Sequence, residues 1–149
     1  MKNIIKIAVV FLLLFFIPFI FAYSHSPTGW QAPEEAKKVK NPVPAVAESL
    51  ERGRKNYIAR CQVCHGEKGD GKGVLAASLP VKPANFTDKK MMDSMTDGEL
   101  FWKITNGKGP MPSWKDTLKE NERWDIINFI RTFSSSQEKE KNKGQEHSK

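Results

Sequence analysis

The residues best suited to chemistry form one run, Cys61-Gln62-Val63-Cys64-His65, which holds both cysteines of the chain. Two thiols three positions apart lie on one face of a helical turn. Both can add to the vinyl groups of a porphyrin, while the histidine that follows presents its imidazole to the iron. A C-x-x-C-H run is typical of covalent haem c attachment. The spacing therefore predicts haem c held by Cys61 and Cys64, with His65 as the proximal iron ligand.

Other uses of the two cysteines fit the sequence less well. A redox dithiol of the thioredoxin type needs a surrounding βαβ pattern, and the chain has no convincing run of β-branched strands. Structural zinc needs four ligands, whereas the remaining histidines, His25 and His147, fall in a spacer and a polar tail. A run with no cofactor would leave a small domain with little to organise its core.

Residues 1–23 predict an export or membrane signal. Lys2 and Lys6 precede a stretch without charge, residues 7–22, as in a positive region followed by an apolar segment. A cleaved signal peptide and a retained transmembrane anchor both fit. The run Ile-Phe-Ala before Tyr23 lacks the first small residue of an A-x-A cleavage site, which favours the anchor. By the positive-inside rule, the chain after Tyr23 then faces the periplasmic side of the cytoplasmic membrane.

Composition divides the rest of the chain into three parts. Residues 24–45 combine several prolines with charges and predict an extended, Pro-rich linker. Residues 46–133 leave room for one domain. Residues 134–149 contain almost no apolar side chain and predict a disordered polar tail. The formal net charge of +7 is not gathered in an arginine-rich stripe, so no nucleic-acid partner is expected.

Apolar residues recur at helical spacing three times within residues 46–133, and the sequence therefore predicts an all-α domain. Gly53 interrupts the first helix at a cost of about 1 kcal/mol relative to alanine, which the close approach of another helix would offset. Thr96 and Glu99 form a capping box at the start of the second helix. The predicted helices are residues 47–59, 99–106 and 120–133.

A second iron ligand is predicted in the loop that follows the middle helix. Pro110 and Pro112 fix the backbone on both sides of Met111, so this thioether is presented from a stiff segment. A plain surface or core methionine is the alternative for Met111. The other candidates, Met91, Met92 and Met95, lie in a polar stretch without flanking prolines.

With the cysteine run, Met111 and the two terminal helices in this order, residues 46–133 resemble the monohaem class I c-type cytochromes. The resemblance implies a small all-α fold in which the N-terminal and C-terminal helices cross over a covalently bound haem, with Gly53 and Tyr57 at the contact. It also implies a carbonyl just before or at a proline that accepts a hydrogen bond from the proximal histidine. Pro83 is the candidate for this position, and Pro80 is the second choice.

These expectations describe an electron-transfer protein rather than an enzyme. It would carry one electron at a time between redox partner proteins on the outer side of the cytoplasmic membrane. Methionine paired with histidine raises the reduction potential relative to bis-histidine or thiolate ligation, and two axial ligands leave no open position for a substrate. Two alternatives remain open: the cytochrome subunit of a larger membrane oxidoreductase, and a haem-based enzyme or sensor if Met111 is not a stable ligand. The sequence does not predict the oligomeric state.

Overall fold

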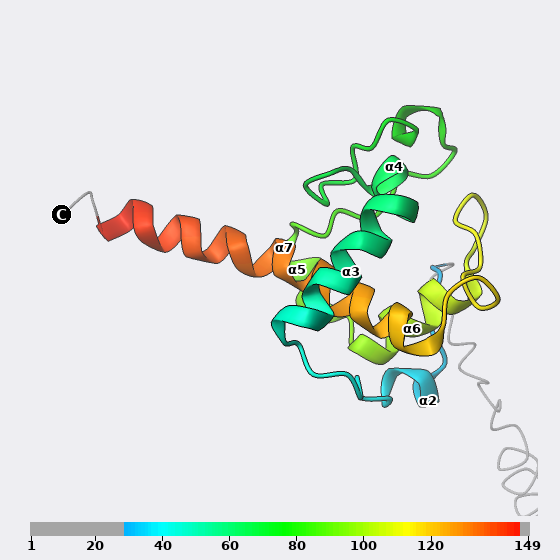
Figure 1. Ribbon diagram of the computed structural model, residues 1–149. Helices are drawn as coiled ribbons and strands as arrows, with labels where there is room; N and C mark the ends of the chain where they lie inside the picture. Colours follow the sequence, from blue (N-terminus) through cyan, green and yellow to red (C-terminus); the bar gives the residue numbers. More distant parts are fainter. Residues whose placement is uncertain (1–28, 147–149) are drawn as a thin grey trace, which may run out of the picture.

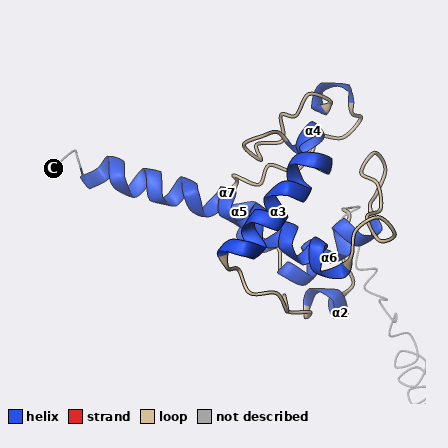
Figure 2. Ribbon diagram, viewed as in Figure 1, coloured by secondary structure: helices blue, strands red, loops and turns tan. Residues whose placement is uncertain are grey.

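The computed structural model describes residues 29–146, with side chains from 29 to 135, and this part of the chain contains helices and loops but no β-strand (Figures 1 and 2). The all-α prediction is therefore confirmed. The predicted signal or anchor, residues 1–23, lies outside the described residues, and no helix within 29–146 is long and apolar enough to cross a membrane. The elements are α2 (Glu34–Lys37), α3 (Ala47–Arg60), α4 (Gln62–His65), the 3-10 helix η1 (Ala76–Ser78), α5 (Lys89–Ser94), α6 (Asp97–Asn106) and α7 (Glu120–Glu146).

Helices α3 and α7 pack against each other at the centre of the fold. A Cβ added at Gly53 would collide with the backbone carbonyl of Asp125 and lie 2.9 Å from Cβ of Phe129. Only a residue without a side chain lets the two backbones approach this closely. Tyr57, one turn further along α3, is buried, and its ring centroid lies 5.4 Å from that of Phe129. The predicted contact at Gly53 and Tyr57 is confirmed.

A buried polar network holds the two helices in register. Asp125 is 1% exposed and accepts hydrogen bonds from Ser49 Oγ at 2.7 Å and from two guanidinium nitrogens of Arg52 at 2.7 and 2.8 Å. Asn128 donates to Ser49 Oγ at 2.8 Å and to the carbonyl of Val43 at 3.0 Å. Buried polar groups that all find partners favour one arrangement over its neighbours. Sliding α7 along α3 would leave these groups unpaired.

Residues 29–45, part of the segment predicted to be an extended, Pro-rich linker, contact the domain and contain the short helix α2. The ring of Trp30 lies 6.5 Å from that of Trp102 on α6. Asn41 donates to the side chain of Asn128 on α7 at 2.8 Å. A few apolar and amide side chains are thus enough to dock this Pro-rich segment on α6 and α7. The earlier residues of the predicted linker lie outside the described part of the chain.

Helix α7 continues to Glu146, well beyond its predicted end at Phe133, and its last part projects away from the rest of the fold (Figure 1). The structure describes residues 134–146 as helix where the sequence predicted a disordered tail, and residues 147–149 lie outside the described chain. Glutamine, glutamate and lysine, which dominate this stretch, are good helix formers. A helix already formed by packing needs no new nucleus to extend.

The ends of α6 follow their sequence signals. The side chain of Thr96 accepts a hydrogen bond from the backbone N–H of Glu99 at 3.1 Å, as the capping box predicted. Gly107 ends the helix with φ of 64°, a conformation that favours glycine. A Cβ at Gly107 would lie 2.5 Å from the backbone carbon of Pro112. The chain therefore folds back tightly onto the end of α6.

Replacing Gly53 with alanine tests the crossing. In an open helix this change stabilises by about 1 kcal/mol. Here the added Cβ meets backbone atoms of α7 that cannot move aside, so Gly53→Ala is expected to lower the free energy of unfolding by about 2 kcal/mol. The measurement is urea unfolding of the haem-loaded protein. Lys55→Ala, on the exposed side of the same helix, is the control and should stay within about 0.5 kcal/mol of the parent.

Candidate haem-attachment site

Cys61, Cys64 and His65 lie on the turn that joins α3 to α4. The carbonyl of Cys61 accepts hydrogen bonds from the backbone N–H groups of Cys64 at 3.1 Å and of His65 at 2.9 Å. Helical bonding therefore continues across the junction and holds the two thiols one turn apart. Both cysteines are free thiols and half-buried. The structure brings these three predicted residues together.

The imidazole of His65 is held by its Nδ1 atom, which lies 3.1 Å from the carbonyl oxygen of Ala84. A carbonyl can only accept, so Nδ1 carries the proton and Nε2 keeps its lone pair for a metal. The ring stacks on Phe86 with centroids 4.6 Å apart. Burial lowers the pKa of His65 below its ordinary value, against the opposing effect of the Ala84 hydrogen bond. The imidazole is therefore neutral at physiological pH, as a metal ligand must be.

The acceptor for His65 is Ala84 and not the predicted Pro83, so that prediction is wrong by one residue. The carbonyl of Pro83 is directed elsewhere: a Cβ on Gly71 would lie 2.7 Å from it. Gly71 has φ of 75°, and its N–H donates to the carbonyl of His65 at 2.8 Å. The glycine-rich loop after the histidine thus packs against residues 83–84 and holds the Ala84 carbonyl near the imidazole. Sequence spacing pointed to the right segment, but only the packing selects the carbonyl.

The same glycine-rich loop is fastened to the core at two further points. Tyr57 donates its hydroxyl hydrogen to the carbonyl of Gly66 at 2.7 Å, and burial raises the pKa of this phenol. The N–H of Phe86 donates to the carbonyl of Gly69 at 2.6 Å. These two bonds fix the glycine-rich loop that follows His65, at Gly66 and Gly69. The sequence showed the glycines but not these partners.

The environment of Cys61 argues against a redox dithiol. Burial raises the pKa of the Cys61 thiol to about 12. Disulfide exchange proceeds through a thiolate, and reactive C-x-x-C pairs lower the thiol pKa to form it. The structure provides the opposite environment at Cys61.

Met111 lies on a different element, the loop 107–118 between α6 and α7. Lys108 and Met111 exchange two backbone hydrogen bonds, of 3.0 and 3.2 Å, which close a tight turn. Just beyond this turn, Ser113 Oγ donates to the carbonyl of Thr105 on α6 at 2.7 Å. The Met111 side chain is half-buried and packs against the core. The loop is therefore fixed by hydrogen bonds in addition to its prolines.

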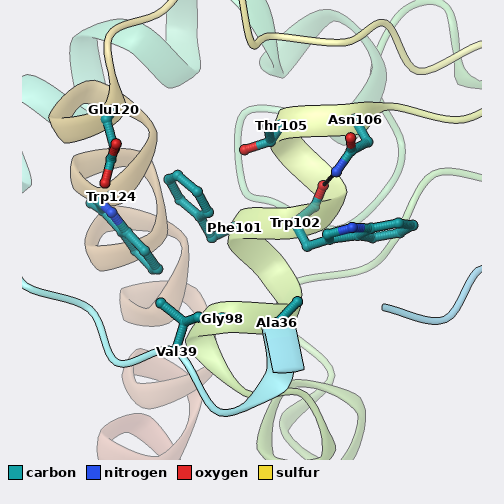
Figure 3. A pocket seen from close by; sticks show the side chains of 9 residues that line it. All are labelled: Ala36, Val39, Gly98, Phe101, Trp102, Thr105, Asn106, Glu120 and Trp124. Carbon is teal, nitrogen blue, oxygen red and sulfur yellow. Dashed lines mark hydrogen bonds between the residues drawn. The ribbon is translucent and has the colours of Figure 1, made fainter. Parts of the chain in front are cut away.

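A separate hollow of about 250 Å³ opens between α2, α6 and the start of α7 (Figure 3). Phe101 stacks on Trp124 within it at a centroid distance of 3.9 Å, and Trp102 lies on the other side of Phe101 along α6. No lining residue comes from segment 61–86 or from loop 107–118. This hollow is therefore not where the two cysteines would hold a porphyrin.

Comparison with known proteins decides the family. The family model described as "Cytochrome C oxidase, cbb3-type, subunit III" matches residues 48–130, which run from α3 into α7. The chain belongs to this cytochrome c family. Cytochrome c6 from Cladophora glomerata is 32% identical over 84 residues, covering 56% of this chain and 88% of the relative. Cytochrome c6 from Nostoc sp. is 29% identical over 87 residues, covering 58% and 73% respectively.

A solved structure agrees with the sequence relatives. A chain of the Kuenenia stuttgartiensis reducing HAO-like protein complex is similar to this cytochrome with a TM-score of 0.54 and 26% identity. The match covers 64% of this cytochrome and 49% of the solved chain. This cytochrome therefore spans about half the length of the solved chain. The recognition of a monohaem class I cytochrome c domain is confirmed. Its cofactor is a covalently bound haem c, and the protein transfers electrons.

The residues present fit this cofactor. Two free thiols lie one turn apart, and the hydrogen bond from His65 to Ala84 leaves Nε2 for the iron. The loop that follows exposes large aliphatic side chains, Val74 by 90%, Leu75 by 46% and Val81 by 65%. A porphyrin can cover such apolar surface favourably. Thiols, imidazole and apolar surface are the components that a covalent haem requires.

Gly71→Ala tests how Ala84 is placed. The added Cβ would push residues 83–84 away from the loop and weaken the bond from His65 Nδ1. This hydrogen bond raises the basicity of a histidine ligand, so its loss should raise the haem reduction potential by roughly 30 mV, about a threefold change in the one-electron equilibrium. Spectroelectrochemical titration measures it. Ser78→Ala, in the same loop but outside this contact, is the control, and equal potentials in the two variants would contradict the assignment.

Proposed function

We propose that this cytochrome is a one-electron carrier in which His65 and Met111 are the axial ligands of a haem attached to Cys61 and Cys64. When bound, the haem iron takes up and releases one electron between its ferric and ferrous states. The observation that carries the proposal is the loop 107–118, which holds a half-buried thioether in a hydrogen-bonded turn on the same small domain as a neutral histidine with Nε2 free.

The two proposed ligands have distinct roles. His65, made more basic by the Ala84 carbonyl, is a firm donor whose ring is oriented by that hydrogen bond and by stacking on Phe86. Met111 supplies a soft thioether, which favours the ferrous state and raises the potential. With both in place no position is left for a substrate, which supports a carrier over an enzyme or sensor.

The setting of this carrier is part of the proposal. Residues 1–23 would hold it at the cytoplasmic membrane with the haem domain on the periplasmic side, where it meets redox partner proteins. The lysines that precede the uncharged stretch support this orientation. Only residues 24–28 separate the predicted anchor from segment 29–45 in the sequence, so the domain would stay close to the membrane.

A second candidate is the cytochrome subunit of a larger membrane oxidoreductase. It is favoured by the description of the matching family, which names an oxidase subunit, and by the solved relative, which belongs to a protein complex. The chemistry at the haem would be the same and only the partner would differ. Extraction in mild detergent separates the two candidates, because a subunit co-purifies with its complex at fixed stoichiometry.

Met111→Ala tests the distal ligand. The haem should remain covalently attached, while the ferric protein loses the weak sulfur-to-iron charge-transfer band. Imidazole should bind the ferric iron at least about tenfold more tightly, because no thioether competes. Met95→Ala is the matched control, since Met95 is also half-buried but its sulfur accepts from Lys103 Nζ at 3.3 Å. A charge-transfer band that survives in the Met111 variant would place the distal ligand elsewhere.

The anchor is tested by fractionation. If residues 1–23 are retained, the haem protein should sediment with membranes after a salt wash and its intact mass should include Met1. A variant that begins at Ser24 behind an unrelated cleavable signal should appear in the soluble periplasmic fraction with the same spectrum. Recovery of the parent protein as a soluble periplasmic chain that lacks its first residues would show cleavage instead.

A further inference from the structure

The loop that carries Met111 ends in a turn whose carbonyl groups converge on one side chain of α7. Arg123 Nη1, which carries two hydrogens, donates to the carbonyl of Leu118 at 2.7 Å and of Lys115 at 3.0 Å, and shares a hydrogen with the carbonyl of Trp114 at 3.4 Å. We propose that Arg123 is a positioning residue that fixes the Met111 loop and thereby limits how easily an external ligand displaces the thioether. The inference rests on the proposed ligation by Met111.

Arg123 is a buried, positively charged side chain. It is 7% exposed, and between residues 29 and 135 it makes no ion pair with a carboxylate. A buried charge is costly unless it is hydrogen-bonded. The guanidinium carbon lies 5.0 Å from the ring centroid of Phe101 on α6, a favourable cation–π arrangement. The hydrogen bonds of Arg123 Nη1 are therefore directed to the loop, while Phe101 stabilises the charge.

The contacts continue from Arg123 toward Met111. The backbone N–H of Leu118 donates to the carbonyl of Trp114 at 3.1 Å, and that of Trp114 donates to the carbonyl of Ile104 on α6 at 3.2 Å. Trp114 is thus held from α6 on one side and by Arg123 on the other. Met111, three residues earlier, lies between this fixed point and the end of α6. Loosening Trp114 would let the whole turn move outward with its thioether.

Lysine cannot replace the arginine in this role. All three bonds start at Nη1, and a lysine ammonium would end one bond short of that position, as a compact charge without the planar group that lies over Phe101. Arg123→Lys therefore keeps the positive charge and removes the geometry. The variant separates positioning from a general effect of charge.

The same helix offers a matched control. Arg131, two helical turns further along α7, also binds backbone carbonyls, of Met92 at 2.5 Å and Met95 at 2.6 Å, and pairs with Asp97. It joins α7 to α5 and α6, and its hydrogen bonds and ion pair go to Met92, Met95 and Asp97, outside loop 107–118. Arg131→Lys should therefore destabilise the fold without loosening the Met111 loop.

The experiment is an imidazole titration of the ferric, haem-loaded protein, with urea unfolding of each variant measured alongside. Arg123→Lys should raise the imidazole affinity about fivefold, the effect of losing one net hydrogen bond, and Arg131→Lys should leave it unchanged. Phe101→Leu, which removes the aromatic face beneath the guanidinium, should shift the affinity in the same direction and serves if Arg123→Lys gives no folded holoprotein.

The outcomes distinguish this inference from the proposed function. If Met111→Ala raises the imidazole affinity but Arg123→Lys and Phe101→Leu match Arg131→Lys, the positioning role of Arg123 is overturned while ligation by Met111 stands. If Met111→Ala itself leaves the affinity unchanged, the proposed ligation fails and the inference with it. A rise confined to Met111→Ala, Arg123→Lys and Phe101→Leu supports both.

Discussion

Because Gly53 has no side chain, the backbone carbonyl of Asp125 occupies the space that a Cβ would need. This contact brings α3 and α7 together, and the buried carboxylate of Asp125 then binds Ser49 and Arg52 on the opposite helix. A small domain has little apolar area with which to fix the angle of two helices. Close backbone packing supplies the attraction here, and the satisfied polar network selects the register.

Both parts of the proposed haem site are continuations of these two helices. α3 passes into Cys61 without a break in hydrogen bonding, so the crossing sets the direction in which the cysteines and His65 face. The first turns of α7 carry Arg123, whose side chain binds the end of the Met111 loop. The ligands come from segments 46 residues apart in sequence, since one follows α3 and the other precedes α7. The packing of α3 against α7 therefore sets the positions of both proposed ligands.

Local signals in the sequence were sufficient for what is local in the fold. The capping box at Thr96 and the apolar spacing in α3 gave helix positions to within a few residues, and the spacing of the cysteines gave the cofactor. Apart from the helix contact marked by Gly53, contacts between distant residues left no such signal. Nothing in the sequence around Ala84 marks its carbonyl, rather than that of Pro83, as the partner of His65, because packing against Gly71 decides it. The docking of Trp30 on Trp102 likewise depends on a surface that exists only after folding.

The loops of this cytochrome fix the two proposed iron ligands through hydrogen bonds to the backbone, without a sheet. A loop exposed to solvent moves unless its backbone groups find fixed partners. Here the partners are backbone carbonyls: that of Ala84 binds the His65 ring, and those of Trp114 and Leu118 bind Arg123. In the proposed carrier the charge of the iron changes while its ligands stay the same. Loops that are already rigid before the electron is transferred suit this role. Arg123 and Gly71 therefore act in the same way, since each holds a loop through a hydrogen bond to a backbone carbonyl.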